Sequence, residues 1–357
     1  MRPSIRICGR DIGLGWPVYI VAELSANHHQ DYNEAIRLLR AAKDSGADAV
    51  KLQTYTPDTL TIDCDNEFFR IGKGTPWEGR KLHDLYGEAY TPWDWHPGLK
   101  EAADGLGLAF FSTPFDHTAV DFLESLSVPA YKIASFELVD LPLLRKAART
   151  GKPVILSTGM STLAEIEEAM QTLREAGAAQ IALLKCTSSY PAPAEEMNLR
   201  AIPHLESEFN VPVGLSDHTM DFVVPVAAVA LGACIIEKHI TLSRSNPGPD
   251  SAFSLEPNEF KAMVQAVRMA ENALGDVRYG VTSHESASLV FRRSLFVVRD
   301  IRAGERFTED NVRSIRPGFG LHTRHLGEVL GKCASRDIPR GTPMSLTLLE
   351  GNDGGDR

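Results

Sequence analysis

Between residues 18 and 275, short apolar runs rich in β-branched residues alternate with longer segments whose apolar residues recur every three or four positions. The short runs predict buried strands, and the longer pattern predicts amphipathic helices. This alternation is typical of parallel βα units. Eight strands are predicted in all, at residues 18–23, 49–53, 108–112, 130–134, 153–157, 180–186, 211–216 and 233–239.

Polar residues and glycines mark the ends of the intervening helices. Asp31 and Glu34 have the spacing of a capping box, as do Thr162 and Glu165, and each helix is followed by a glycine. Eight βα units in a stretch of this length predict a (β/α)8 TIM barrel. An open sheet would usually carry a GxGxxG turn after its first strand, and the sequence has none there.

After residue 275 the pattern changes to a polar connector followed by short predicted strands and turns. We therefore predict a barrel domain over residues 1–280 and a small, mostly non-helical domain over residues 281–350. Residues 351–357 are polar and rich in glycine, which predicts a frayed tail.

Composition narrows the possible partners. The 357 residues are 43% hydrophobic, enough for a full core, and carry a formal charge of -10. An acidic chain argues against nucleic-acid and anionic-membrane partners, although a few lysines can still hold a small anion. The five scattered cysteines lack CxxC spacing, which predicts reduced thiols and a cytoplasmic location. No segment reaches the roughly 20 apolar residues of a membrane span.

Active sites of such barrels lie at the carboxyl ends of the strands, so polar residues there carry the candidate chemistry. Lys51 and Lys132 end two different strands, and serine or threonine stands at several other strand ends. Together they form a plausible cradle for a phosphate and a carboxylate. Alternatively, the two lysines pair with Glu23 and Glu137 as structural ions at the barrel mouth. Residue types alone leave both interpretations open.

His218 and His239 end the seventh and eighth predicted strands. Two imidazoles suit a borderline divalent ion such as Mn2+, with water and substrate completing its shell. Zinc would more often have a third protein ligand. A solvated or capping role is expected for six other histidines: His28, His29, His83, His96, His117 and His204.

Seven motifs in order resemble the sialic-acid synthase family of phosphoenolpyruvate-dependent nonulosonic acid synthases. They are Glu23-Leu-Ser-Ala-Asn-His28, Lys51-Leu-Gln-Thr-Tyr55, Phe111-Ser-Thr-Pro-Phe115, Tyr131-Lys-Ile-Ala-Ser135, Leu156-Ser-Thr-Gly-Met160, Gly214-Leu-Ser-Asp-His218 and Glu237-Lys-His239. The C-terminal segment, with Arg316-Pro-Gly-Phe-Gly320, resembles the family's antifreeze-like, or SAF-type, domain. The insert after the second strand, including Gly74-Thr-Pro-Trp-Glu-Gly79, resembles the pseudaminic-acid branch.

The resemblance implies a metal-dependent condensation of phosphoenolpyruvate with an open-chain amino sugar. The branch implies 2,4-diacetamido-2,4,6-trideoxy-L-altrose as the sugar, giving pseudaminic acid and phosphate. The alternative is the same reaction on another amino sugar, as in an N-acetylneuraminate or legionaminic acid synthase. From fold alone, a metal-dependent hydrolase or a non-catalytic carbohydrate-binding protein is also possible. The first would usually show an HxH motif after the first strand, and the second would have lost a lysine or a histidine.

The resemblance also implies roles for single residues. Those implied to be catalytic are Glu23, Lys132, Glu137, His218 and His239. Those implied to bind phosphoenolpyruvate are Lys51, Thr113, Lys132, Ser135, Ser157, Ser188 and Ser216. Those implied to contact the sugar are Gln53, Glu137, Tyr190, Asp250 and Arg316.

His218 and His239 are the implied ligands of the metal, with Mn2+ expected and Mg2+ or Co2+ as alternatives. Ser188 stands where the sialic-acid branch often has asparagine. Arg316 is implied to reach from the antifreeze-like domain of one subunit into the barrel of its partner. We therefore expect a domain-swapped homodimer in which Arg316 acts in trans.

Overall fold

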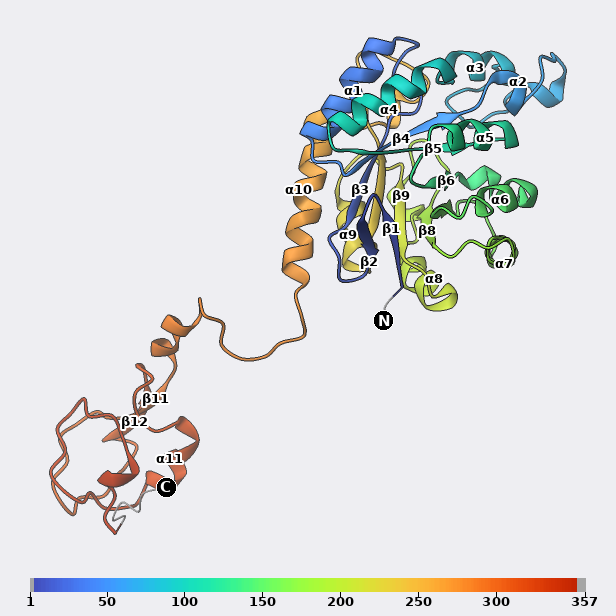
Figure 1. Ribbon diagram of the computed structural model, residues 1–357. Coiled ribbons are helices and arrows are strands. Elements are labelled where there is room, and N and C mark those ends of the chain that lie inside the picture. Colours follow the sequence, from blue (N-terminus) through green and yellow to red (C-terminus); the bar gives the residue numbers. More distant parts are fainter. Residues whose placement is uncertain (1–2, 352–357) are drawn as a thin grey trace. The chain divides into compact units, whose positions relative to one another are not determined.

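The computed structural model describes residues 3–351, which form two compact units that meet in the sequence between Gly275 and Asp276. Figure 1 shows the helices and strands of each unit. Except for Gly351, the predicted tail of residues 351–357 lies outside the described residues.

The first unit is a closed barrel of eight parallel strands, which confirms the predicted fold (Figure 1). The strand β10 pairs with β3 and so closes the cylinder, with His239 opposite Glu23; Glu23 in turn lies opposite Lys51. The register therefore sets three candidate residues side by side. The strands are β3 (Tyr19–Glu23), β4 (Ala49–Thr54), β5 (Ala109–Pro114), β6 (Tyr131–Ile133), β7 (Val154–Ser157), β8 (Ile181–Cys186), β9 (Val213–Asp217) and β10 (Ile235–His239).

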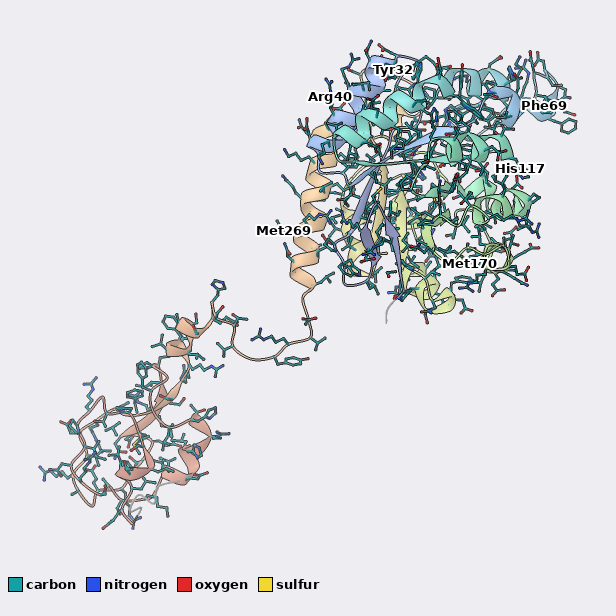
Figure 2. The ribbon with its side chains drawn as sticks, in the orientation of Figure 1. Tyr32, Arg40, Phe69, His117, Met170 and Met269 are labelled. Carbon is teal, nitrogen blue, oxygen red and sulfur yellow. The ribbon has the colours of Figure 1, made fainter. Side chains whose placement is uncertain are left out.

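Helices cover the outside of the barrel, and each buries one face against it. In α10, Phe260, Met263 and Val267 are buried, whereas Met269 lies on the face that points away from the strands (Figure 2). None of the helices in residues 3–351 is both long and apolar enough to cross a membrane. The barrel helices are α1 (Tyr32–Asp44), α4 (His96–Gly105), α5 (His117–Ser125), α6 (Leu141–Ala148), α7 (Leu163–Glu175), α8 (Ala201–Phe209), α9 (Val223–Ala230) and α10 (Pro257–Leu274).

Residues 55–95, called the insert below, separate β4 from α4 and contain the short helices α2 (Pro57–Leu60) and α3 (Leu82–Ala89). Aromatic contacts fasten its C-terminal end to the barrel helices. Trp93 stacks on Phe122 with ring centroids 4.7 Å apart, and Trp95 meets the edge of Tyr32 at 5.6 Å. These two tryptophans therefore hold the insert in place.

An N-terminal hairpin, β1 (Ser4–Ile7) and β2 (Arg10–Gly13), was not predicted from the sequence. Its Ile5, Ile7 and Ile12 are buried in one cluster with residues near the amino ends of the barrel strands, such as Tyr19 and Ala49. The hairpin therefore fills the amino end of the barrel.

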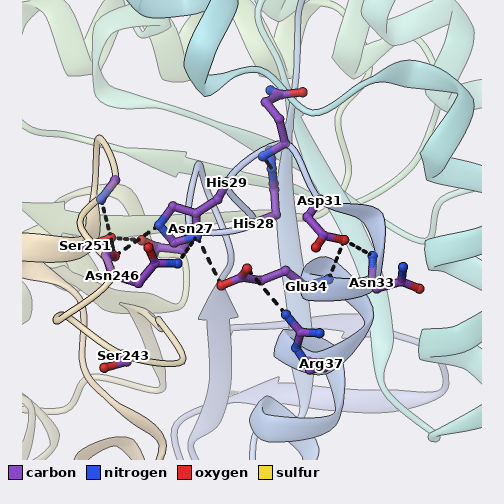
Figure 3. A network of polar contacts seen from close by, with 12 residues as sticks. Asn27, His28, His29, Asp31, Asn33, Glu34, Arg37, Ser243, Asn246 and Ser251 are labelled. Carbon is purple, nitrogen blue, oxygen red and sulfur yellow. Dashed lines mark hydrogen bonds and ion pairs between the residues drawn. The ribbon is translucent and has the colours of Figure 1, made fainter.

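Of the two predicted capping boxes, the structure contains the one at α7 but not the one at α1. Thr162 and Glu165 form the reciprocal box at α7, as predicted. Asp31 caps α1, but the prediction of a box there was wrong, because Glu34 turns to His29 instead (Figure 3). The Nδ1 atom of His29 lies 3.1 Å from Glu34 Oε1, and its Nε2 atom lies 3.1 Å from the carbonyl oxygen of Asn246.

The second unit is built from short strands and turns around a small core. The strands β11 (Ser294–Val297) and β12 (Val312–Ile315) pair in antiparallel fashion, and α11 (Leu326–Val329) is a single turn. Apolar side chains such as Leu295 and Phe307 form a core separate from that of the barrel.

A fully buried ion pair joins β9 and β10. Lys238 Nζ lies 2.5 Å from Asp217 Oδ2 and also donates to the carbonyl oxygen of Thr219. Asp217 Oδ1 accepts from the backbone amide of Thr219 at 3.0 Å. The pair thus fixes the chain just after β9, where His218 lies.

We expect Lys238→Met to lower the free energy of unfolding by about 3–5 kcal/mol, because Asp217 would stay buried without its counter-ion. Urea denaturation of the barrel measures the change. The matched control is Lys100→Met, which breaks a half-exposed pair with Asp104 on α4 and should cost less than about 1 kcal/mol. Equal losses in the two variants would contradict the prediction.

Candidate active site

The carboxyl ends of the barrel strands surround a cavity of about 400 Å³. Twelve of the residues singled out in the sequence line it: Glu23, Lys51, Gln53, Lys132, Ser135, Glu137, Ser157, Tyr190, Ser216, His218, His239 and Asp250. Thr113 and Ser188 are not among the lining residues, but each lies within 4 Å of one of them. Arg316 is exposed on the second unit.

Two buried lysines and two buried carboxylates form the floor of the cavity. Lys51 Nζ lies 3.1 Å from Glu23 Oε2 and 3.0 Å from Glu237 Oε1. Lys132 Nζ lies 3.7 Å from Glu237 Oε1 and donates to Ser157 Oγ at 2.7 Å. The lysines are therefore ion-paired, as one interpretation of the sequence proposed, but with Glu237 in the place expected for Glu137. They also face the cavity, so pairing and ligand binding are compatible.

Burial and neighbouring charge shift the pKa values of Glu23 and Glu237 in opposite directions. Burial raises the pKa of Glu23, and Lys51 only partly offsets this effect. Burial also acts on Glu237, but Lys132 and Lys51 together outweigh it and lower its pKa. Glu237 therefore holds the negative charge, and Glu23 is the group that takes up a proton. Two carboxyl groups whose pKa values are pushed apart are typical of acid and base partners.

Burial also moves the pKa values of Glu137 and Lys132 toward neutral pH, from opposite sides. Burial raises the pKa of Glu137 to about 7, and burial lowers the pKa of Lys132 to about 8. The Oε2 atom of Glu137 is buried without a hydrogen-bond partner among the described residues. Both groups can therefore change protonation near neutral pH.

Hydroxyl groups surround the lysines on several strands. Thr113 Oγ1 accepts from Lys51 Nζ at 3.4 Å, and Ser216 Oγ donates to Glu237 Oε1 at 3.2 Å. Ser135 Oγ accepts from the amide of Gly159 at 3.0 Å. A Cβ atom at Gly159 would lie 2.4 Å from Ser188 Oγ and 2.7 Å from Ser135 Oγ. Only glycine there allows both hydroxyls to approach the strand end.

His218 and His239 lie next to each other, with ring centroids 5.4 Å apart. His218 Nδ1 donates to the carbonyl oxygen of Thr187 at 3.0 Å, which leaves the lone pair of Nε2 free. His239 Nδ1 is buried and has no hydrogen-bond partner among the described residues. These two nitrogens fit a divalent cation as ligands.

The protein supplies few ligands to such an ion. Within residues 3–351, no group of three or more His, Cys, Asp and Glu side chains has the arrangement of a metal site. Water and substrate would therefore complete the shell, which is the arrangement of a catalytic site rather than a structural one.

An aromatic cluster holds the two imidazoles in place. Phe253, which is fully buried, lies 5.1 Å from the ring of His239 and 4.9 Å from Tyr190. Tyr190 in turn lies 4.5 Å from His218 and 5.6 Å from Trp77 of the insert. Trp77 Nε1 donates to the carbonyl oxygen of Pro249 at 3.0 Å. The insert is thus fastened to the loop that follows β10.

On the other side of the floor, Gln53 joins Glu23 to the loops above it. Gln53 Nε2 donates to Glu23 Oε1 at 3.1 Å and to Ser25 Oγ at 2.8 Å. The Ser25 hydroxyl donates to Asp250, whose pKa burial raises. Gln53 and Asp250 therefore belong to one hydrogen-bonded network at the cavity wall.

A solvated or capping role was expected for His28 and His96, but neither is solvated, because both are fully buried. His28 Nε2 lies 3.1 Å from Thr91 Oγ1, and His96 Nε2 accepts from Thr54 Oγ1 at 2.9 Å. Burial lowers the pKa of each imidazole to about 4. These neutral histidines fasten the C-terminal end of the insert to the barrel.

Comparison with known proteins agrees with this site. The NeuB family model matches residues 38–279, and the SAF domain model matches residues 292–350. The chain is 49% identical to a pseudaminic acid synthase of Campylobacter jejuni, over 92% of this chain and 95% of the relative. It is 47% identical to a pseudaminic acid synthase of Helicobacter pylori, over 94% and 98% of the two chains.

Among solved structures, the N-acetylneuraminic acid synthetase of Leptospira borgpetersenii superposes with a TM-score of 0.72 at 33% identity. The match covers 81% of this chain and 96% of that structure. The chain belongs to the NeuB family. Members of this family are phosphoenolpyruvate-dependent synthases that form a carbon–carbon bond, and this chain is such an enzyme.

Several lining residues received no role from the sequence. Glu237 could have been found from strand alternation, because it is two residues before His239 and so faces the same side of β10. Trp77 and Phe253 follow no strand directly, and only the folded loops bring them to the cavity. Cys186 ends β8 beside His218, at 3.9 Å from its Nδ1 atom.

The buried histidines predict a pH-dependent stability. In the unfolded chain an imidazole has an ordinary pKa near 6.5, whereas in the fold the pKa of His28 is about 4. The unfolded state therefore binds the extra proton between these values, and stability falls as the pH drops from 6.5 to 4. Each such histidine accounts for a loss of about 3 kcal/mol across this window.

His28 Nδ1 accepts from the amide of Gln30, so its Nε2 donates to Thr91. His28→Gln keeps an N–H donor for Thr91 but cannot titrate, so its stability deficit relative to the native protein should narrow by about 3 kcal/mol from pH 6.5 to pH 4. Urea denaturation at several pH values measures the deficit. The control is His117→Gln, at an exposed position of α5. A deficit that stays constant in His28→Gln, or narrows equally in the control, would refute the prediction.

Proposed function

We propose that this chain condenses phosphoenolpyruvate with 2,4-diacetamido-2,4,6-trideoxy-L-altrose and releases pseudaminic acid and phosphate. The two curated relatives described above support this sugar, because both carry the name pseudaminic acid synthase. The observation that carries the chemistry is the charged floor, where two lysines, a ring of hydroxyls and two imidazoles meet in one cavity.

Phosphoenolpyruvate fits the side of the floor that contains the lysines. Lys51 and Lys132 would neutralise its phosphate and carboxylate, and hydroxyls such as Ser157 and Ser216 would donate to the remaining oxygens. Glu237 compensates both ammonium groups in the free enzyme. When phosphoenolpyruvate binds, it takes over from Glu237 as the counter-ion of the lysines, so that neither lysine is buried without a negative partner.

C3 of phosphoenolpyruvate attacks the aldehyde carbon of the open-chain sugar, water adds at C2, and the C2–oxygen bond to phosphate then breaks. Glu23 takes up a proton readily and lies next to the metal ligands, so we assign it to position the attacking water and to accept its proton. Gln53 orients this carboxyl group through its amide. The lysine and hydroxyl contacts hold the two reactants in attack geometry.

His218 and His239 would hold a divalent ion, which we propose to be Mn2+. The chemistry that such an ion supplies is polarisation of the aldehyde oxygen by a Lewis acid. Thr187 fixes the ring of His218 through Nδ1, and Phe253 packs against both imidazoles. These contacts support the imidazoles as preformed ligands.

We further propose that the enzyme is a domain-swapped homodimer in which Arg316 reaches the barrel of the partner. Exposed apolar side chains follow the carboxyl ends of β6, β7 and β9, where a monomer would leave them in water. Such a patch is typical of a protein interface. The residues concerned are Phe136, Val139, Met160, Leu163, Met220, Phe222 and Val223.

We place the enzyme in the cytoplasm. All five cysteines are free, and Cys186 lies beside the proposed metal ligand His218. Reduced thiols of this kind are typical of the cytoplasm.

The function is tested by following phosphate release from phosphoenolpyruvate with each of three sugars: the diacetamido altrose, N-acetylmannosamine and the legionaminic acid precursor. We expect turnover of the altrose sugar, loss of activity with EDTA, and recovery when Mn2+ is added back. His239→Asn should lower kcat by on the order of 10³-fold, because it removes a ligand of the Lewis acid. Exposed His204→Asn is the control. Turnover of N-acetylmannosamine alone would sink the assignment of the sugar.

The dimer is tested by mixing two inactive variants, Arg316→Ala and His218→Ala, under conditions in which subunits exchange. Half of the dimers become mixed, and each of these regains one complete site if Arg316 acts in trans. Activity should rise to roughly a quarter of that of the native enzyme. Failure to recover activity, with mixed dimers confirmed by differential tags, would count against the swap.

A further inference from the structure

The cavity has two chemically different parts. Its floor, made by the barrel strands, carries the lysines, carboxylates and imidazoles. Its outer wall comes from the insert, which contributes Tyr55, Trp77 and Tyr86 together with five aliphatic side chains without a polar atom: Leu60, Ile71, Leu82, Leu85 and Ala89. We call these five residues the aliphatic wall.

The side chains of the aliphatic wall are not part of the hydrophobic core of the barrel. Leu85 is buried, but Leu60, Ile71, Leu82 and Ala89 are only partly buried and face the cavity. The wall also has a fixed position, because Trp77 bonds to Pro249 on one side of it and the buried His28 holds Thr91 on the other. A fixed apolar surface in front of a charged floor predicts a ligand with one polar and one apolar end.

We propose that the aliphatic wall binds the C6 methyl group of the sugar and so selects N-acylated 6-deoxy aldoses. This inference rests on the proposed function. In that reaction the aldehyde carbon must lie at the floor, beside the lysines and imidazoles, so the other end of the carbon chain points away from them. A methyl group loses no hydrogen bond against aliphatic side chains, whereas a hydroxyl group there gives up its water without a new partner.

The magnitude of this selection follows from its physical cause. An apolar pocket rejects an added hydroxyl group only moderately, by a factor of about 10 to 100 in kcat/KM. If the two sugars also differed at several stereocentres, the ratio of their kcat/KM values would not report the effect of the 6-hydroxyl group alone. The informative pair is therefore 2,4-diacetamido-2,4,6-trideoxy-L-altrose and its 6-hydroxy analogue, which have the same configuration throughout.

The experiment measures kcat/KM for both sugars by phosphate release, with phosphoenolpyruvate and Mn2+ present. The native enzyme should prefer the 6-deoxy sugar about 10- to 100-fold. Ile71→Asn and Leu82→Asn place an amide in the wall that can bond to the 6-hydroxyl, so each should reduce the preference about tenfold or more. Because the preference is a ratio within one variant, a general loss of activity cancels.

The matched control is Ile62→Asn, which makes the same change at an exposed position of the insert outside the cavity lining and should leave the ratio unchanged. Ile71→Val and Leu82→Met keep the wall apolar and should also retain it. A native ratio near one, or unchanged ratios in both asparagine variants, would overturn this inference alone. No turnover of either sugar by the native enzyme would overturn the proposed function as well.

Discussion

The ammonium group of Lys51, held between the carboxylates of Glu23 and Glu237, is the contact on which the rest of the site depends. The three side chains come from β4, β3 and β10, and β10 becomes a neighbour of β3 only when the barrel closes. Burying the ammonium group of Lys51 or the carboxylate of Glu237 alone would be costly, and Glu23, which can take up a proton, provides Lys51 with a second partner. The closed barrel and the charged floor therefore support each other, and a substrate anion must compete with carboxylates already in place.

Much of the fold could be predicted from the sequence, because strands buried on both faces leave uninterrupted apolar runs. The positions of His218, His239 and the two lysines followed from the rule that strand ends meet at one rim. The N-terminal hairpin was missed, since Ile5, Ile7 and Ile12 give only a short alternation beside a polar turn.

Other features could not be predicted for physical reasons. The burial of His28 and His96 depends on the insert, whose path is set by tertiary contacts rather than by periodicity. Gly159 has a role only because Ser135 and Ser188 converge on it from different strands. One interpretation paired the two lysines with Glu23 and Glu137. Glu23 does pair with Lys51, but the register of β10 brings Glu237 to both lysines in the place expected for Glu137.

The hairpin at the amino end of the barrel has a consequence for how the enzyme handles its reactants. Ile5, Ile7 and Ile12 fill that end of the barrel, so the cavity opens at the carboxyl ends of the strands. Both reactants therefore reach the charged floor, and both products leave it, on the carboxyl side of the strands.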